Sequence, residues 1–443
     1  MAVMLLAVVA AVAAFPHDDV VLHKREFFPS TYERVEMHRD HEWLATPVTF
    51  TILLKQKNLE QLEDLFWKVS DPTHEMYGQF LTAGEVHTMT QTPLKAREEV
   101  LNWVQAVYKH VAHQSHELVV VDRHDALRIT APVSVVEALF KTTLAAFKRT
   151  RGNFGEKLWI KYIDTISVPR KFENVIDLVT GIVEFAPLPQ GLKTYESRAR
   201  GTFNCNVPYT MKRMYSIDED LKVATQMASQ APYSEVGNKQ EGFGASDLKT
   251  FQQINGVEVK AITNIIGDDA PNYTEMDTDT EAALDVQCLT GFAEGANTSF
   301  WVMNDWMYEF ANEILNTNEP PLVNSMSYGW YESQQCRIDG NCTNEGFGTS
   351  EDYVKRTDVE FQKLGVIGIT MLAASGDDGV ESDKQCDKMR PDYPASSVYV
   401  TSVGATAVVD DDQSDPSIPA SAPAVCHDST YDCSCSTSNL EHS

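Results

Sequence analysis

The chain of 443 residues carries 64 acidic and 36 basic residues, a formal net charge of −28 at pH 7. So strong a negative charge argues against nucleic acids and anionic membranes as partners, because both would repel it. The length allows two or three domains with their own cores, and the acidic balance suits either an acidic compartment or solubility alone.

The N-terminal residues MAVMLLAVVAAVAA read as a secretory signal peptide at residues 1–14. The apolar run from Met4 to Ala14 is too short to span a membrane, and its small residues predict cleavage near Ala13 or Ala14. No later stretch is long and apolar enough to cross a bilayer. We therefore expect a soluble protein, without a membrane partner, after signal removal.

Eight cysteines and three glycosylation sequons fit the secretory pathway; the sequons lie at Asn272, Asn297 and Asn341. Cys336 and Cys342 flank a short polar loop and are predicted to form a local disulfide. Three further cysteines, at 426, 433 and 435, lie in a Ser-rich tail. Disulfides are the preferred interpretation there, because no second Cys/His cluster with zinc spacing accompanies them.

The first half of the chain mixes helix and strand, which predicts an α+β domain at residues 17–187. Apolar periodicity predicts helices at residues 58–69, 94–107 and 133–140, and strands at residues 48–54, 126–130 and 144–148. Short strands that alternate with helices indicate a compact sheet with helices on one face.

Periodicity stops at residues 188–206, where Pro, Gly, Ser and basic residues predict an exposed linker. Lys193, Arg198 and Arg200 make this segment an attractive site for proteolytic processing. A plain interdomain linker explains the composition equally well.

The second half, residues 207–443, alternates strands and helices in the manner of an α/β domain. The predicted strands are 300–303, 322–326, 366–373 and 399–403, and the predicted helices are 308–315 and 353–364. The nearly continuous apolar run at 366–373 is typical of a parallel sheet covered on both faces. The sequence SGDDG follows this run, at the carboxyl end of the strand, where such sheets place functional loops.

Glu281 and Asp285 are four residues apart in the segment TDTEAALDVQCL, so on a helix they share one face. Their neighbours are apolar almost all round, which predicts a buried helix on which two acids are costly unless paired or hydrogen-bonded. A catalytic pair is one interpretation. An ordinary acid in the first helical turn is an alternative for Glu281, whereas Asp285 lies deeper in the helix.

Two further interpretations of these acids stay open. Asp277, Asp279 and Glu281 alternate as metal ligands can, but the segment lacks the glycine and distal glutamate of an EF-hand loop. A glycosidase could use Glu281 and Asp285 as its carboxyl pair. Acids one helical turn apart would then have to flank a sugar ring, and the SGDDG block would stay unexplained. SGDDG alone could also be a strand-to-loop turn capped by aspartate.

Five segments resemble the sedolisin family of serine-carboxyl peptidases, and particularly its tripeptidyl-peptidase branch. DPTHEMYGQFLTAGEV is similar to the activation domain of these proenzymes, of the pro-kumamolisin type. TEAALDVQ, NSMSYGW, EFQKLGVIGITMLAASGDDG and DYPASSVYVTSVGAT follow in the order of the family's peptidase domain. Four ordered blocks are far more specific than any one of them.

The resemblance implies a subtilisin-like parallel-sheet catalytic domain, preceded by an α+β prodomain. It also implies a Ser-Glu-Asp triad in which Glu281 is the general base and Asp285 the acid that orients it. Asp377 matches the residue of the oxyanion hole. Ser325, Ser327 and Gly329 lie on the edge against which a peptide or protein substrate would pair.

No residue of this chain matches the nucleophilic serine of the family. The family's Gly-Thr-Ser motif follows the SGD block, whereas residues 348–350 of this chain have those letters but precede it. The calcium site of complete family members, rich in Asp and Gly, is also not found, so no metal ligand is assigned. The peptidase domain is therefore expected to be incomplete at its C-terminus, with the catalytic serine outside the printed chain and this polypeptide inactive as written.

The predicted function is an acid-active peptidase proenzyme, whose partners are its own prodomain and a peptide substrate. The expected location is extracellular or a lysosome-like compartment. The alternative is a catalytically inactive proenzyme-like protein that binds peptides or inhibits a related peptidase.

Overall fold

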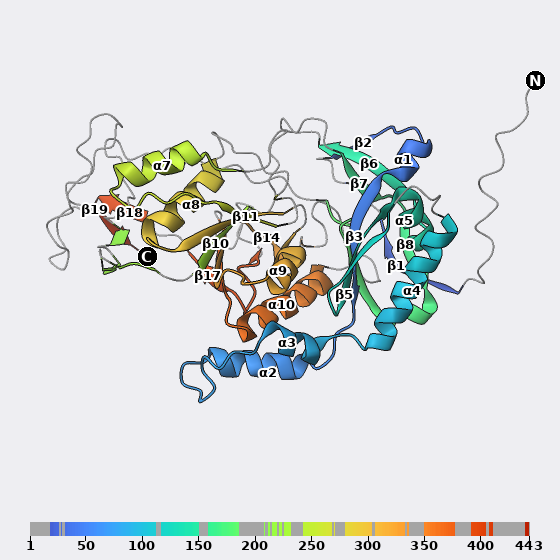
Figure 1. Ribbon diagram of the computed structural model, residues 1–443, viewed down its shortest axis with the longest axis horizontal. Helices are drawn as coiled ribbons and strands as arrows, with labels where there is room; N and C mark the ends of the chain where they lie inside the picture. The colour runs from blue at the N-terminus through green and yellow to red at the C-terminus, as the bar shows by residue number, and fades with distance from the viewer. Residues whose placement is uncertain are drawn as a thin grey trace, which may run out of the picture. The chain divides into compact units, whose positions relative to one another are not determined.

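The computed structural model is shown in Figure 1. It describes residues 18–25, 28, 32–111, 117–149, 158–185, 208, 211–212, 215–218, 221–223, 226–231, 242–267, 270, 280–303, 306–332, 335, 350–376, 391–404, 407–410 and 439–442. The chain forms two compact units. The first comprises Met1–Leu188 and Ser333–Ile367, and the second comprises Pro189–Glu332 and Gly368–Ser443.

The described strands of the first unit form three antiparallel sheets, with orders β4-β5-β3-β9, β2-β6-β7 and β1-β8. The strands are β1 Asp19–Lys24, β2 Tyr32–Val35, β3 Pro47–Leu54, β4 Val119–Asp122, β5 Ala126–Pro132, β6 Leu144–Arg149, β7 Trp159–Tyr162, β8 Thr165–Pro169 and β9 Ile176–Thr180. The predicted strands at 48–54, 126–130 and 144–148 are confirmed as β3, β5 and β6. The single compact sheet that we expected is divided among these three sheets.

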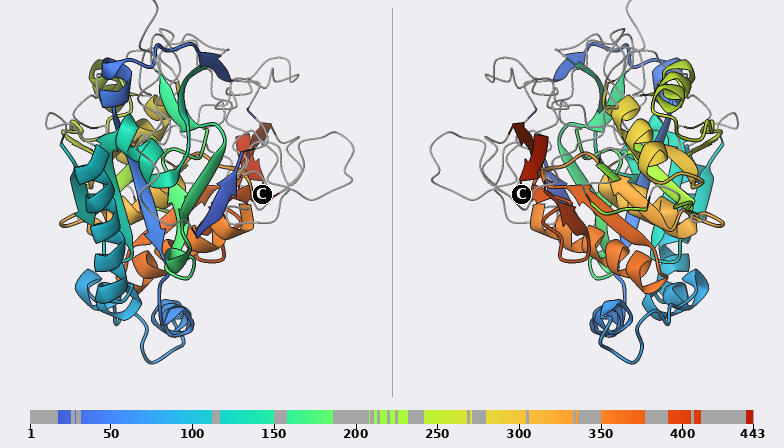
Figure 2. Two further views of the ribbon diagram at one scale, coloured as in Figure 1. Left: turned by 90° about the vertical axis from the view of Figure 1, so that its right-hand side faces the viewer. Right: turned by 90° about the vertical axis from the view of Figure 1, so that its left-hand side faces the viewer.

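Some helices of the first unit pack on its apolar core, and others lie together away from that core (Figure 2). They are α1 His41–Ala45, α2 Leu59–Ser70, α3 Ala83–Thr90, α4 Leu94–Val111, α5 Val133–Phe140 and the short 3-10 helix Arg170–Phe172. Helix α5 packs on β3 and α4 packs on α5, and Val104, Phe140 and Phe50 belong to one buried cluster. The predicted helices at 58–69, 94–107 and 133–140 are confirmed, and α4 is one turn longer than expected.

Helix α10, Ser350–Val366, belongs to the first unit although it comes from the second half of the sequence. It packs against α2 and α3, as Figure 1 shows. The ring of Phe66 lies against Gly365, where a side chain would overlap it. The missing side chain therefore allows α2 and α10 to approach closely.

A buried group of charges fixes α10 in this unit. Arg356 and Lys363 of α10, both less than 5% exposed, form ion pairs with Glu360 of the same helix and with Asp125, which precedes β5. Gln56 donates to both acids, at 2.6 Å to Asp125 and 3.2 Å to Glu360. Burial disfavours the Asp125 carboxylate, but the charges of Lys363 and Arg356 outweigh burial and lower its pKa to about 2.

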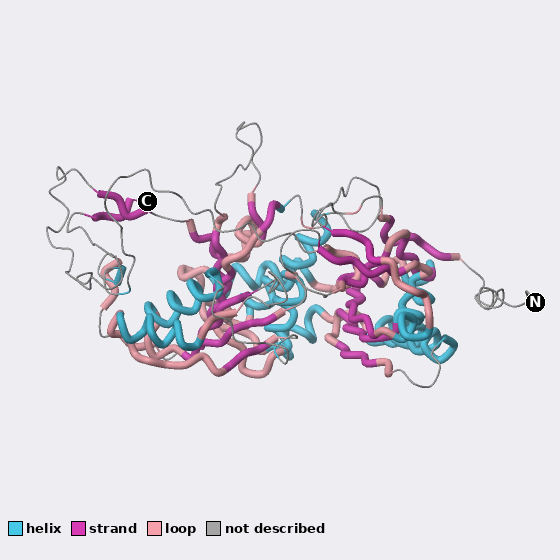
Figure 3. The backbone as a smooth tube through the Cα atoms, turned by 90° about the horizontal axis from the view of Figure 1, so that it is seen from above, coloured by secondary structure: helices cyan, strands magenta, loops and turns pink. Residues whose placement is uncertain are grey.

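The described part of the second unit is organised around a six-stranded sheet with the order β11-β12-β10-β13-β15-β17. Every neighbouring pair in it is parallel. Its strands are β10 Gln226–Ala231, β11 Asn264–Ile266, β12 Asn297–Val302, β13 Val323–Met326, β15 Thr370–Ala374 and β17 Thr401–Val403. The tube in Figure 3 shows this sheet together with its helices.

The helices of this unit lie between strands in the sequence: α7 Ala245–Ile254, α8 Thr280–Phe292 and α9 Met307–Asn316. Two antiparallel pairs complete the described elements, β14 Trp330–Tyr331 with β16 Asp392–Tyr393, and β18 Ala407–Asp410 with β19 Asn439–His442. The predicted strands at 300–303 and 322–326 and the predicted helices at 308–315 and 353–364 are confirmed as β12, β13, α9 and α10.

The predicted strand at 366–373 is wrong at its start. Helix α10 continues to Val366, and a turn at Ile367 and Gly368 separates it from β15. Gly368 has a φ of +87°, which glycine adopts without the steric cost of a side chain. The apolar run is thus shared between a buried helix end and a strand. The strand expected at 399–403 likewise begins later, at Thr401.

Several predictions fall outside the described residues: the signal peptide, the linker at 188–206, seven of the eight cysteines, and the sequons at 272 and 341. Asn297 is described and lies exposed at the start of β12. In the part of the chain that is described, no helix has the length and apolar character needed to cross a membrane.

Candidate active site

Helix α8 carries the two acids that the sequence singled out, Glu281 and Asp285. The helix follows β11 and precedes β12, which are parallel neighbours in the sheet. A helix that leaves a strand of a parallel sheet begins near the carboxyl ends of the strands. The first turns of α8, and both acids with them, therefore lie toward the sheet edge where ligand sites form in α/β folds.

One face of α8 is buried and another is exposed. Ala282 and Val286 pack with Leu248 of α7 and Phe300 of β12 in one apolar cluster. Leu284, in contrast, is 48% exposed. The prediction of a helix buried all round is therefore wrong: alanine and leucine populate either face of a helix, and only the packing against α7 and β12 selects the inner one.

Asp285 lies on the inner side of α8, with only 8% of its surface exposed. The hydroxyl of Ser327 donates a hydrogen bond to its Oδ1 atom at 2.6 Å. Ser327 comes directly after β13, 42 residues further along the chain. A hydroxyl bond of this length to a carboxylate is in the range of charge-assisted bonds, which are stronger than bonds between neutral groups. The sequence grouped Ser327 with substrate binding, and its bond to the acid was not predicted.

Cys288 reports electrostatically on both acids. Burial raises the pKa of its thiol to about 11, and the negative charges of Asp285 and Glu281 contribute in the same direction. Residues 281, 285 and 288 are spaced by four and three, so they follow one another along one side of the helix. The two carboxyl groups therefore act on the same side of α8, as their spacing predicted.

The segment 325–329 continues β13 toward β14. Ser325 pairs with Ser229 of β10 and with Leu372 of β15, so it is inside the sheet. Gly329 lies against the backbone of Tyr393, and a Cβ atom there would come within 3.0 Å of the Tyr393 carbonyl oxygen. The segment is thus fixed by sheet pairing before Ser327 and by close backbone packing after it.

The SGD turn follows β15, the strand beside β13. Met326 is in register with Ala373, so the two strands end side by side. The amide of Ser375 donates to the carbonyl of Val403 at 3.0 Å. Gly376 has a φ of +94°, and a side chain there would overlap the carboxylate of Asp392. Asp377 is outside the described residues, so its predicted place in the oxyanion hole stays a prediction.

The structure thus brings together Asp285 and Ser327, and it places the ends of β13 and β15 next to each other. Glu281 precedes Asp285 at helical spacing on the same side of α8. The roles of these residues and of Ser325, Gly329 and Asp377 remain predictions, because the geometry alone identifies no reaction.

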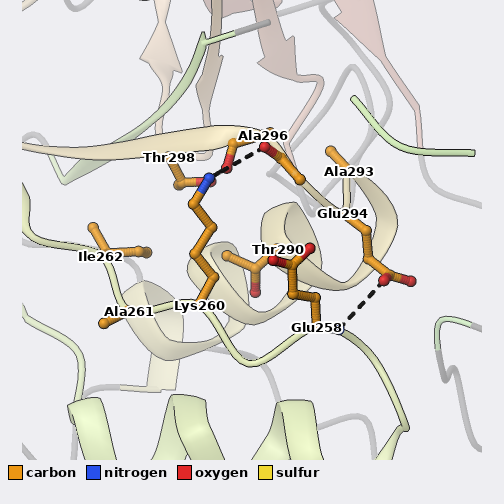
Figure 4. Close-up of a pocket in the computed structure, with 10 residues that line it drawn as sticks. Glu258, Lys260, Ala261, Ile262, Thr290, Ala293, Glu294, Ala296 and Thr298 are labelled. Carbon is orange, nitrogen blue, oxygen red and sulfur yellow. Dashed lines mark hydrogen bonds between the residues drawn. The ribbon is translucent and has the colours of Figure 1, made fainter. Parts of the chain in front are cut away.

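A pocket near the C-terminal end of α8 is lined by neither Glu281 nor Asp285 (Figure 4). Two of its charged groups, Lys260 and Glu294, are engaged within the protein. Lys260 donates to the carbonyls of Gly295 and Ala296 at 3.2 and 2.9 Å, and Glu294 forms ion pairs with Lys212 and Lys222. Thr290, the residue of α8 that lines the pocket, is nine positions from Glu281, about 14 Å along the helix. This pocket is therefore not the predicted site.

The described residues contain no group of three or more His, Cys, Asp or Glu side chains arranged to hold a metal ion. The calcium site expected for complete family members is not tested by this observation, and it stays a prediction.

Residues 44–185 match the family model described as "Pro-kumamolisin, activation domain". Physarolisin from Physarum polycephalum is 34% identical over 89% of this chain and 65% of its own length. Tripeptidyl-peptidase 1 from Rattus norvegicus is 29% identical over 83% of this chain and 65% of its own length. The chain therefore spans less than two thirds of these curated relatives.

A solved structure of Pseudomonas sedolisin, a serine-carboxyl proteinase, is 19% identical over 48% of this chain and 56% of that chain, with a TM-score of 0.34. That likeness is too low to support an argument about the fold, whereas the sequence relatives and the activation-domain match are informative.

Proposed function

We propose that this chain is an acid-active serine-carboxyl peptidase in its proenzyme form, because it is similar to physarolisin and tripeptidyl-peptidase 1 and because residues 44–185 match the pro-kumamolisin activation domain. Its substrates would be peptides, and the tripeptidyl-peptidase likeness favours removal of tripeptides from a free N-terminus. The observation that carries the proposal is the nearly buried Asp285 on α8, hydrogen-bonded to Ser327, with Glu281 one turn earlier.

Glu281 would act as the general base in peptide hydrolysis. It would take the proton of the nucleophilic serine as the serine oxygen attacks the scissile carbonyl carbon, and it would return the proton to the leaving amine. Asp285 would orient Glu281, as the third group of a triad orients the base. A carboxylate base suits acidic solution, because a histidine would be protonated there and could not accept the proton.

Asp377 would have the opposite task from Glu281. As a neutral acid it would donate a hydrogen bond to the oxyanion of the tetrahedral intermediate. Acidic solution favours this protonated form. Its position in the sequence, directly after the Ser375 and Gly376 that follow β15, supports the role because β13 and β15 end side by side. Ser327 and Gly329 would line the proposed substrate segment, by backbone pairing with the substrate. Ser325, which the sequence grouped with them, is already paired with β10 and β15, so it would support the segment from within the sheet and not pair with substrate itself.

The nucleophilic serine is proposed to come from sequence outside the printed chain, since the Gly-Thr-Ser motif does not follow the SGD block. The parallel sheet would then be the major part of a subtilisin-like domain. Calcium would be bound by the same outside sequence, so no residue of this chain is assigned to it.

The proenzyme organisation is proposed with the boundaries set out above: a signal peptide at 1–14, a prodomain at 17–187, a processing region at 188–206 and the peptidase domain from 207. The prodomain would be the intramolecular partner of the peptidase. The protein would act after secretion or in a lysosome-like compartment, where low pH suits its carboxyl chemistry.

The test is peptide hydrolysis by the complete product of the native transcript after acid treatment. We expect release of tripeptides from a peptide with a free N-terminus, resistance to pepstatin, and no release from the same peptide with a blocked N-terminus. Cleavage inside the blocked peptide would make the protein an endopeptidase of the same type. No hydrolysis, with tight inhibition of a related peptidase, would instead favour the inactive alternative.

A further inference from the structure

The hydrogen bond between Ser327 and Asp285 joins two parts of the proposed active site. Asp285 belongs to the helix with the proposed base, and Ser327 belongs to the segment proposed to pair with substrate. The donor and acceptor atoms are 2.6 Å apart and partly buried. Few solvent molecules can therefore replace the hydroxyl if it is removed, and a buried polar group that loses its partner is costly.

We propose that Ser327 is a positioning residue that holds the carboxyl group of Asp285 in the orientation needed to align Glu281. This inference rests on the proposed function and adds to it a residue whose side chain has no role there. The hydroxyl donates its only proton to Oδ1, so it favours Asp285 as an acceptor in its charged form.

The backbone around Ser327 supports a positioning role. The residue before it, Met326, is fully buried and paired with Ala373. Two residues later, Gly329 packs on the Tyr393 carbonyl. A side chain between two such fixed points has little freedom, and a rigid donor loses little entropy when it forms its bond. The same rigidity would make the geometry of the acid pair depend on the segment that receives substrate.

The first measurement compares steady-state kinetics of three variants of the complete native product. S327A removes the donor, S327T keeps a hydroxyl, and T290V removes a different buried hydroxyl of α8, which donates to the Val286 carbonyl. We expect kcat to fall about tenfold to hundredfold in S327A, as when outer partners of catalytic groups are removed. KM should stay within about threefold, because binding contacts remain.

The kinetic measurement also includes the pH profile. Loss of the donor removes a hydrogen bond to the charged form of Asp285, so the acidic limb of kcat should move to higher pH in S327A. S327T and T290V should keep the profile of the wild type. An equal loss of kcat in T290V, or an unmoved limb in S327A, would overturn the positioning role in favour of a general effect on the fold.

The second measurement does not need activity and uses the printed chain. Carbodiimide with glycine methyl ester is applied at pH 5, and fragment ions of the peptide that contains α8 separate modification at Glu281 from that at Asp285. We expect Asp285 to react about threefold to tenfold faster in S327A, the factor for loss of one hydrogen bond. S327T and T290V should react as the wild type does. Equal Asp285 rates in wild type and S327A would overturn the inference.

These two measurements separate the inference from the proposed function. A native product that hydrolyses no peptide contradicts the function, while the carbodiimide rates still decide whether Ser327 holds Asp285. A fluorophosphonate adduct found on Ser327 would overturn the inference in another way, because the residue would then be a nucleophile.

Discussion

Replacing Asp285 with asparagine is expected to make the thiol of Cys288 more reactive, because Cys288 senses the charge of the acid pair. Burial is the largest cause of its high pKa, and the charges of Asp285 and then Glu281 add to it. The D285N substitution keeps the size of the side chain and removes its charge. It therefore tests directly whether the carboxylates face the same side of α8.

The size of the effect follows from the pKa of about 11 against an ordinary value of 9.0. At pH 8 this thiol is ionised about a hundredfold less than an ordinary one. Returning the pKa of the Cys288 thiol fully to its ordinary value would speed its alkylation only about tenfold, because a less basic thiolate is also a weaker nucleophile. Since burial remains after the substitution, D285N should speed it about twofold to fivefold. E281Q should have a smaller effect in the same direction.

The assay is alkylation by iodoacetamide at pH 8, followed by mass spectrometry of the peptide that contains Cys288, so the other cysteines do not interfere. Glu319→Gln is the control, since this exposed acid after α9 is not among the groups that shift the thiol. Labelling in denaturant should be equal in all variants. An unchanged native rate in D285N, with an intact thermal transition, would refute the proposed arrangement of charges on α8.

Three further predictions concern packing and charge elsewhere. Asp125→Asn should lower the free energy of unfolding of the first unit by about 3–5 kcal/mol, measured by urea titration, because it breaks a buried group of ion pairs. Glu351→Gln, which breaks an exposed ion pair, should lower it by less than about 1 kcal/mol in the same titration. Equal effects of the two substitutions would contradict this prediction. Burial, with nearby positive charge, lowers the pKa of His87 to about 4. The folded state therefore resists protonation of His87, and stability should fall as pH drops from 6.5 toward 4. His87→Gln should reduce this loss of stability in melting curves recorded over that pH range, and an unchanged dependence of melting temperature on pH would exclude His87 as a cause. Gly329→Ala should lower the melting temperature of the second unit, because its Cβ would come within 3.0 Å of the Tyr393 carbonyl; an unchanged melting temperature would show that the backbone shifts without cost.

The elements with strong periodicity could be predicted from the sequence, and those without it could not. The eight apolar-rich residues 133–140 form α5 with the predicted bounds. Strand β10, QMASQA, is paired on both sides in the parallel sheet, but it contains no β-branched or aromatic residue to indicate a strand. Its conformation depends on pairing with β12 and β13, which local sequence does not encode.

The position of α10 depends on contacts that are distant in the sequence. Arg356 and Lys363 look like a solvated helix face, yet they are buried against Asp125, more than 230 residues away. In the candidate site, the spacing of Glu281 and Asp285 predicted a shared helix face, which the electrostatic effect on Cys288 supports. The bond from Ser327 could not be predicted, because a serine after a strand resembles many others until β13 is placed beside α8.

The central claim is that Glu281 and Asp285 perform the acid–base chemistry of peptide hydrolysis. The most direct test is to measure kcat at acidic pH for the E281Q and D285N variants of the complete native product, with Glu319→Gln as the control. Removal of a general base or of its orienting acid should lower kcat by about 10²- to 10⁴-fold, with the control close to the wild type. Variants that keep full activity at the pH optimum of the wild type would contradict the claim.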